Sequence, residues 1–222
     1  WGHFSWQWKR KLENVPASQI IEIIKTNPGA DVYTFHPFPW ETAFAWNVWE
    51  QGQWCHPHIV ELAEIILTEM GTNPKVIQMP MGSKDYLCVN YFVGNEHFWQ
   101  GLMSWLHTFV DVCGRLPPKY LDLLNTPAGY EANPKLDYRG FICERMISTF
   151  LALNTNKVLV RPFIEVYKNR IPQEYLDLVL LKDKALETKD KKYLQEYLDR
   201  RPALRPQDRN WGKEWIDSCE LW

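Results

Sequence analysis

The chain has 222 residues, 45% of them hydrophobic, so it can bury a core as one large domain or as one domain with an appendage, and disorder along its whole length is excluded. Its 25 lysines and arginines against 27 acidic residues give a formal net charge of -2, so no overall positive field attracts nucleic acid, and a nucleic-acid enzyme is disfavoured. Charges or amides interrupt every apolar stretch well before the roughly 20 residues that a bilayer span needs.

The N-terminal part of the chain predicts a helix, a turn and a strand in that order. An apolar stripe indicates a helix over residues 16–26, which an Asn-Pro-Gly sequence ends, and residues 31–35 then alternate as a short strand. Two prolines in residues 36–40 lack the amide donors of a strand, so we expect a loop there. This order is typical of one unit of an α/β fold, in which ligands bind at the loops that follow the strands.

The middle of the chain predicts two long helices and two strands. Pro57 suits the first turn of a helix that reaches residue 70, with Gly71 after its end. Residues 76–79 and 86–92 have the composition of strands, and Asn95 is the expected cap of a helix that continues to residue 113. A loop-rich stretch with one short helix should follow, over residues 117–133.

The last part of the chain changes in character near residue 171. Residues 138–153 predict a helix whose apolar run is interrupted by Glu144 and Arg145, and residues 158–160 predict a strand. Beyond residue 171 charged residues dominate, so we expect one or two solvated helices there, as a separate appendage.

Five widely spaced cysteines, without a Cys-x-x-Cys pair, indicate free thiols in a reducing compartment. We therefore expect a cytoplasmic protein. The chain starts directly in an aromatic cluster, which suggests that it is a part of a larger polypeptide.

Tryptophan is unusually frequent, with twelve in the chain and seven of them in the first 54 residues. Indole combines a flat apolar face with one N–H donor, which suits a surface that binds a partly polar ligand such as a sugar. The candidate binding residues of this aromatic and amide region are His36, Trp40, Asn47, Trp49 and His56. The alternative is that these side chains form a tryptophan-rich core under a long loop.

Three familiar chemical motifs are weak or missing. The sequence CHPH at residues 55–58 could contribute metal ligands, but no second close pair of cysteines or histidines completes a zinc site, so we predict no metal ligands. No Gly-x-Ser-x-Gly motif supports a serine nucleophile. Gly82, Ser83 and Lys84 lack the preceding glycine of a phosphate-binding loop.

Glu144 and Arg145 are the strongest catalytic candidates. A carboxylate and a guanidinium on a mainly apolar helix must be paired, exposed or functional. In one interpretation they are an exposed edge or a structural ion pair. In the other, Glu144 is a general base, and Arg145 binds a phosphate or orients Glu144. Asn90 and Tyr91 precede the Asn95 cap. In one interpretation they bind a ligand, and in the other this region is a helix cap beside core aromatics.

Four parts of the chain are distinctive: GHFSWQWKRK at residues 2–11, DVYTF at 31–35, NYFV at 90–93 with FW at 98–99, and FICERMISTF at 141–150. Together, in this order, they resemble glycosyltransferase-like proteins of bacterial capsule and surface-polysaccharide gene clusters. The resemblance implies a GT-A type α/β domain over residues 1–170, with a partial mixed sheet flanked by helices, that transfers a sugar from a nucleotide-activated donor to a glycan. Residues 171–222 would be the charged helical appendage.

Matched position by position, the resemblance places Ser5 and Trp6 near the nucleotide sugar, Asn90 and Tyr91 near the sugar, and Glu144 with Arg145 at the acceptor. Such proteins usually bind a divalent metal through an Asp-x-Asp motif, which this chain lacks. The metal site and the first nucleotide-binding strands could precede Trp1, the protein could be independent of metal, or it could be a non-catalytic relative. We expect a glycosyltransferase, with a non-catalytic carbohydrate-binding or protein-interaction module as the alternative.

Overall fold

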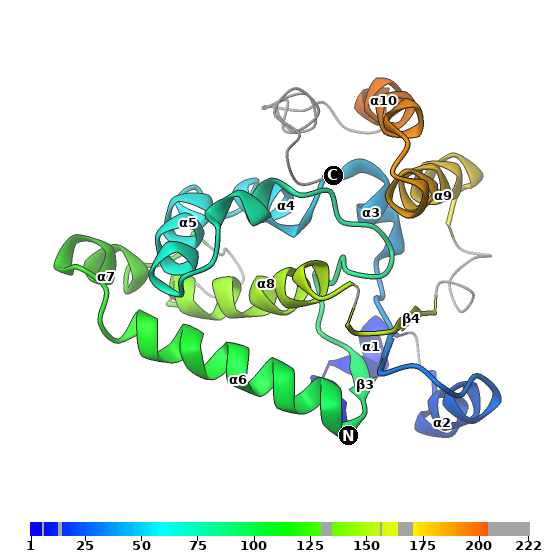
Figure 1. Ribbon diagram of the computed structural model, residues 1–222, viewed down its shortest axis with the longest axis horizontal. Coiled ribbons are helices and arrows are strands. Elements are labelled where there is room, and N and C mark those ends of the chain that lie inside the picture. Colours follow the sequence, from blue (N-terminus) through cyan, green and yellow to red (C-terminus); the bar gives the residue numbers. More distant parts are fainter. Residues whose placement is uncertain (6, 13–14, 130–134, 156, 164–170, 204–222) are drawn as a thin grey trace.

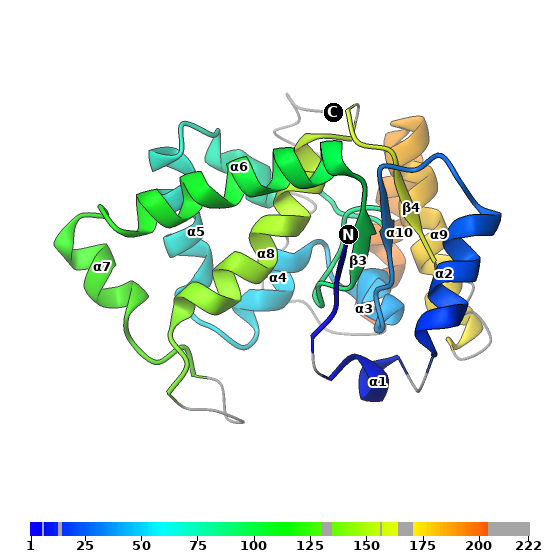
Figure 2. The same ribbon diagram turned by 90° about the horizontal axis from the view of Figure 1, so that it is seen from below.

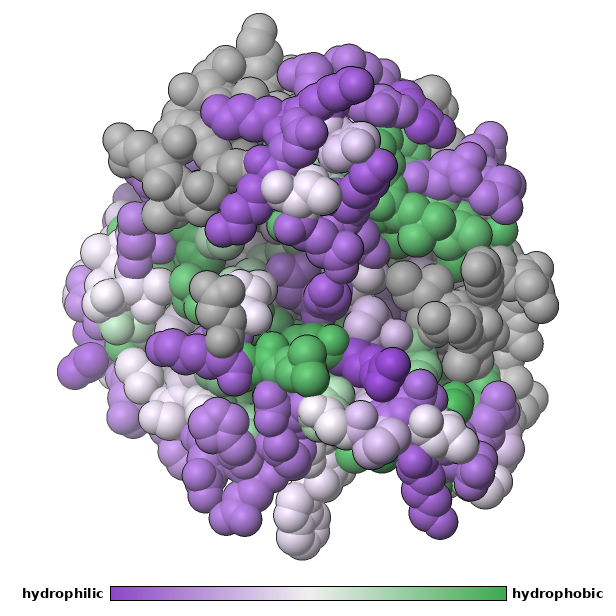
Figure 3. Space-filling model, turned by 45° about the vertical axis from the view of Figure 1, so that its right-hand side comes forward, coloured by the Kyte–Doolittle hydropathy of each residue, from purple (hydrophilic) through white to green (hydrophobic). Residues whose placement is uncertain are grey.

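The structure is a computed structural model that describes residues 1–5, 7–12, 15–129, 135–155, 157–163 and 171–203. This part of the chain has an α/β fold, with ten α-helices and a small four-stranded mixed sheet (Figure 1). The predicted fold class is therefore confirmed at the level of a mixed sheet flanked by helices. On the face in Figure 3, polar side chains predominate and apolar patches lie between them.

The sheet has the strand order β1-β3-β2-β4. The strands are β1 (Gly2–His3), β2 (Val32–Thr34), β3 (Phe92–Gly94) and β4 (Val160–Pro162). Strand β3 pairs antiparallel with both β1 and β2, whereas β4 runs parallel to β2. The sheet thus joins the N-terminal segment to strands that lie far along the chain.

Side chains alternate between the two faces of the sheet, as the two-residue period of a strand requires. Val32 and Phe92 pack with apolar residues of α6 (Glu96–Cys113) and α8 (Tyr138–Leu153), whereas Tyr33 packs with residues of α2 (Ala17–Thr26). Figures 1 and 2 show α2 on one side of the sheet and α6 with α8 on the other. The sheet is therefore the middle layer between helices.

Both long helices next to the sheet begin as the sequence predicts. The side chain of Asn95 accepts a hydrogen bond of 2.9 Å from the backbone amide of Phe98 at the start of α6. Asp137 caps α8 in the same way, with its carboxylate accepting from the amide of Arg139 at 3.0 Å. These caps fix the ends of the helices that flank the candidate site.

A second helical layer contains the most deeply buried tryptophans. It comprises α3 (Pro39–Phe44), α4 (Val48–Gln53), α5 (Ile59–Glu69), the 3₁₀ helix η1 (Pro74–Gln78) and α7 (Pro118–Leu124). Trp46 and Trp49 are 0% exposed there. The indole N–H of Trp46 donates to the Gln78 carbonyl at 2.6 Å, and that of Trp49 donates to the Thr149 hydroxyl at 3.0 Å. These two indoles therefore stabilise the core.

Two predicted strands are wrong, for local reasons. Residues 76–79 lie in and just after η1, because Asn73 caps this turn by accepting from the Lys75 amide at 3.0 Å, and Pro74 suits its first position. Of residues 86–92 only Phe92 belongs to a strand. The backbone of Leu87 instead bonds the hydroxyl of Ser148 through both its amide and its carbonyl.

The loop expected after the first strand is short, because Pro39 already begins α3 and can occupy a first helical turn without an amide donor.

The described C-terminal part consists of α9 (Gln173–Thr188), α10 (Lys191–Arg200) and the short η3 (Arg201–Ala203). Helices were predicted here, but they are not solvated on all sides. The amine of Lys182 is buried and donates to the carbonyls of Thr42 at 2.9 Å and Ala45 at 2.6 Å. The division of the chain at residue 171 stays a prediction.

Two carboxylates, the buried Asp85 and the half-buried Asp183, organise the loop after η1, and Asp183 links it to α9. Asp85 accepts from the amide of Gly82 at 2.7 Å, and Asp183 accepts from the amide of Ser83 at 2.7 Å. Burial, together with the nearby Asp183 charge, raises the pKa of Asp85 to about 7, although the hydrogen bond from the Gly82 amide and the Lys182 charge partly offset this. Folding therefore takes up a proton at Asp85 between its ordinary pKa of 3.8 and about 7, so this group lowers the stability as the pH rises.

Asp85→Asn should remove this pH dependence. Asparagine keeps the acceptor for the Gly82 amide and has no charge to bury, so the variant should differ little from wild type near pH 4 and be more stable above about pH 7, by about 2–4 kcal/mol. Urea unfolding at both pH values measures the difference, with Asp111→Asn on the exposed face of α6 as the control. Equal stability differences at the two pH values would contradict the expectation.

Candidate functional site

A cavity of about 620 Å³ lies where the β1–β3 edge of the sheet meets α6 and α8. It brings together chain segments that are more than 100 residues apart. Its polar lining residues are His3, Ser5, Lys11, Asn90, Tyr91, Trp99, Asp137 and Glu144, and its apolar ones include Phe92, Leu102, Met103, Leu106, Leu136, Phe141 and Ile147.

Glu144 enters the cavity from α8, where it is half-buried. Burial raises the pKa of its carboxyl above the ordinary value of 4.5. The charges of Arg145 and Lys11 oppose this rise, and that of Glu41 adds to it. A carboxylate with a raised pKa is a better proton acceptor, as a general base requires.

Asn90, Ser5 and the buried Tyr91, which is 1% exposed, lie along one side of the cavity. The hydroxyls of Ser5 and Tyr91 are 2.8 Å apart, and the Asn90 amide donates to the Glu144 backbone carbonyl at 3.1 Å. The buried Oδ1 of Asn90 has no hydrogen-bond partner among the described residues. An unmet buried acceptor calls for an explanation, and a bound ligand hydroxyl is one.

Six polar or aromatic residues of the lining were not predicted as site residues. All but one of them lie within the segments that carry the family resemblance: His3, Lys11, Phe92, Trp99 and Phe141. The exception is Asp137. Lys11 ends α1 (Trp8–Lys11), with its amine 5.9 Å from the centre of the Phe38 ring. Lys11 gives the cavity a cation that the sequence had led us to expect from Arg145.

Arg145 has a structural role and does not line this cavity. Its side chain donates to the carbonyls of Val48 at 2.9 Å and Phe141 at 2.9 Å, and to the side chain of Gln51 at 2.6 Å. It is 5% exposed, and the Cα of Gly52 lies so close that a Cβ there would be 2.4 Å from the guanidinium. The guanidinium therefore ties α8 to α4.

The residues of the tryptophan-rich region do not reach the cavity either. Burial lowers the pKa of His36 to about 3, and its ring lies 3.7 Å from the Cys88 sulfur. Trp40 is half-buried and packs edge-on against Phe38 at 5.3 Å. Trp6 lies outside the described residues.

Asn47, Trp49 and His56 are buried in the helical layer. Asn47 caps α4 and donates to the carbonyl of Ile77 at 2.6 Å. The His56 ring lies 2.7 Å from the Ala128 carbonyl. For Asn47, Trp49 and His56, the structure favours the core interpretation over the binding one.

The CHPH segment is not assembled into a metal site. Cys55 is exposed, His56 is buried, and His58 lies 3.5 Å from Glu61. Within the described ranges, no group of three or more histidines, cysteines or acidic residues could hold a metal ion.

Comparisons with protein-family models, with curated proteins and with solved structures found no significant match to this chain. Of the helices that the structure describes, none is long and apolar enough to cross a bilayer. The interpretation of the cavity therefore depends on its own chemistry.

Proposed function

We propose that the protein is a glycosyltransferase that moves a sugar from a nucleotide-activated donor to a glycan acceptor in this cavity. The observation that supports it is the meeting of Glu144 with Ser5, Asn90 and Tyr91, all four of them predicted site residues, around one space of about 620 Å³. A GT-A type domain, a role in surface-polysaccharide synthesis and the expected cytoplasmic location are parts of this proposal.

In the proposed reaction Glu144 is the general base. Its carboxylate takes the proton of an acceptor hydroxyl, whose oxygen then forms a bond to the anomeric carbon of the donor sugar. The bond between that carbon and the diphosphate breaks, and the diphosphate leaves with the electron pair. Lys11 can stabilise the charge that develops on the diphosphate, and the amide of Asn90 can bind sugar hydroxyls.

A divalent metal would assist the leaving diphosphate in most proteins of this kind. The described residues offer no set of ligands that fits such an ion, so no step of the proposed reaction is assigned to a metal.

Titration with uridine, guanosine and deoxythymidine diphosphates, with and without Mn²⁺, tests the donor half of the proposal by calorimetry. One of the three should bind saturably, and Lys11→Ala should weaken it about tenfold, the loss of one charge-assisted hydrogen bond. Lys9→Ala is the matched control, because Lys9 is exposed on the same helix and does not line the cavity. Failure of all three nucleotides to bind would contradict the proposal.

The alternative is a carbohydrate-binding module without chemistry. It is favoured by the half-buried indole of Trp99 in the lining, since a flat apolar surface suits the face of a sugar ring. Saturable glycan binding together with no nucleotide binding would support this second function.

A further inference from the structure

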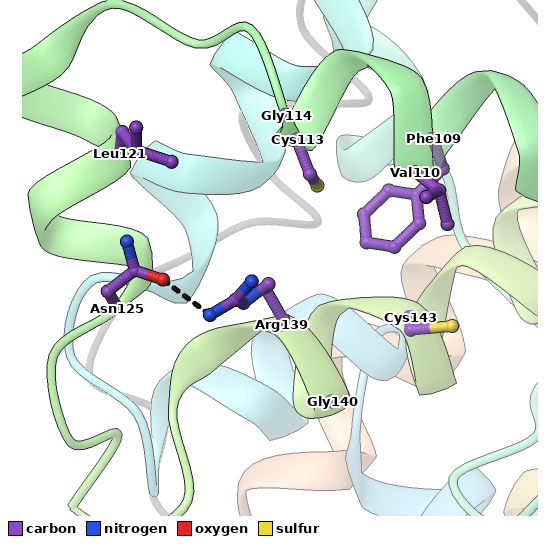
Figure 4. A pocket seen from close by; sticks show the side chains of 9 residues that line it. All are labelled: Phe109, Val110, Cys113, Gly114, Leu121, Asn125, Arg139, Gly140 and Cys143. Carbon is purple, nitrogen blue, oxygen red and sulfur yellow. Dashed lines mark hydrogen bonds between the residues drawn. The ribbon is translucent and has the colours of Figure 1, made fainter.

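A second cavity of about 500 Å³ adjoins the first, between α6, α7 and α8. Phe109, Val110 and Cys113 line it from α6, and Cys143 from α8 (Figure 4). Gly140 and Cys143 line both cavities, so the two spaces meet at this part of α8.

The two cavities follow one face of α6. Met103, Leu106, Val110 and Cys113 line them in turn, and their spacing of three or four residues places them on the same side of a helix. From Trp99 to Gly114 this face is roughly 22 Å long at about 1.5 Å per residue. We call the joined cavities the α6–α8 groove.

The α6 wall of the α6–α8 groove is apolar. All the α6 residues that line it are uncharged, and they are Trp99, Leu102, Met103, Leu106, Phe109, Val110, Cys113 and Gly114. Beside Gly140, where the cavities adjoin, Arg139 lies 3.0 Å from the Asp137 carboxylate of the first cavity and 2.5 Å from the Asn125 side chain. Figure 4 shows the contact between Arg139 and Asn125. The charged groups of the groove therefore come from α1 and from α8 and its N-terminal cap, and the α6 side is its apolar wall.

We propose that the α6–α8 groove holds the alkyl chain of an amphiphilic acceptor, whose hydroxylated head group lies at Glu144. A glycan or an extended peptide along the groove would bring hydroxyls or amides against the α6 face, which offers apolar side chains instead of hydrogen-bond partners. An alkyl chain has no such requirement and gains from leaving water. The placement of the head group rests on the proposed function, whereas the binding of the chain does not.

Gly140 offers a way to block the groove. A Cβ at this position would meet no atom within 4 Å, so a larger side chain would enter the open space where the cavities join. The position is exposed and lies inside α8, where leucine is a better helix former than glycine. Gly140→Leu should therefore obstruct the groove without unfolding the protein.

Calorimetric titration with alkyl glucosides from butyl to nonyl, below their micelle concentrations, tests the proposal. The affinity of the wild type should rise up to about fourfold per methylene, from the transfer of each group out of water. The heat-capacity change should become more negative along the series, as burial of apolar surface requires. An affinity that does not depend on chain length would overturn the proposal.

Gly140→Leu should remove most of this chain-length dependence. Ser104→Leu, at an exposed position of α6 outside both cavities, adds a leucine side chain elsewhere and should keep it. Equal slopes in Gly140→Leu and wild type, or equal loss in both leucine variants, would contradict the assignment. Glu144→Gln should keep the dependence of affinity on chain length even though it impairs transfer. A failure of alkyl-chain binding and a failure of the proposed function would therefore give different results.

Discussion

Replacing Arg201 with methionine should lower the free energy of unfolding by about 3–5 kcal/mol, because the substitution leaves the Glu50 carboxylate buried without its cation. The guanidinium contacts both carboxylate oxygens, at 2.9 and 3.1 Å, and the two side chains are 2% and 4% exposed. Glu50 also accepts a hydrogen bond of 2.5 Å from the Trp46 amide. Loss of the cation should therefore destabilise both α4 and the C-terminal helices.

Urea unfolding followed by tryptophan fluorescence measures this effect, and the neighbouring arginine is the control. Arg200 pairs with Glu196 at 3.2 Å, but both side chains are nearly half exposed, so Arg200→Met should change the stability by at most about 0.5 kcal/mol. The double variant Glu50→Gln with Arg201→Met should recover part of the loss, since no unpaired charge remains. A loss below about 1 kcal/mol in Arg201→Met would show that the pair does not hold α4 to η3.

Glu144→Gln should lower the rate of sugar transfer by about 10²–10⁴-fold, the usual contribution of a general base. The amide keeps the size of the side chain but cannot take a proton from the acceptor. Glu64→Gln, at an exposed site on α5, should leave the rate unchanged. An active wild type with an equally active Glu144→Gln variant would reject the assigned role.

The pH dependence of transfer gives a second readout of the same residue. Only the ionised carboxylate accepts a proton, and burial raises the pKa of Glu144, so the rate should rise with pH through a value above 4.5. The Lys11 charge opposes this rise, so Lys11→Met should move the acidic limb to higher pH. If the acidic limb of the pH profile does not move in this variant, the Lys11 charge does not act on the Glu144 carboxylate.

The sequence predicted the helices next to the sheet because their signals are local. The Asn95 cap and the apolar period of α6 lie within one stretch of chain, and the structure confirms both. Residues 76–79 were predicted as a strand because they are apolar, but the cap at Asn73 and the proline after it decide the conformation. The four-stranded sheet could not be predicted in full, since the pairing of β1 with β3 joins segments about 90 residues apart.

The sequence identified four residues of the cavity but could not separate them from core residues of similar type. Trp49 looked like a ligand-binding indole, but its partner, Thr149, lies 100 residues away along the chain. Arg145 follows Glu144 directly, and adjacent positions on a helix point in different directions, so one side chain enters the cavity and the other is buried against α4. Such contacts become visible only in the folded chain.

A crystal structure of the protein with a nucleoside diphosphate and an alkyl glucoside tests the central claim most directly. We expect an acceptor hydroxyl within hydrogen-bond distance of the Glu144 carboxylate, the diphosphate beside Lys11, and the sugar beside Asn90. Density for the glucoside at Trp40 or elsewhere outside the cavity, with Glu144 contacting no ligand atom, would contradict the account.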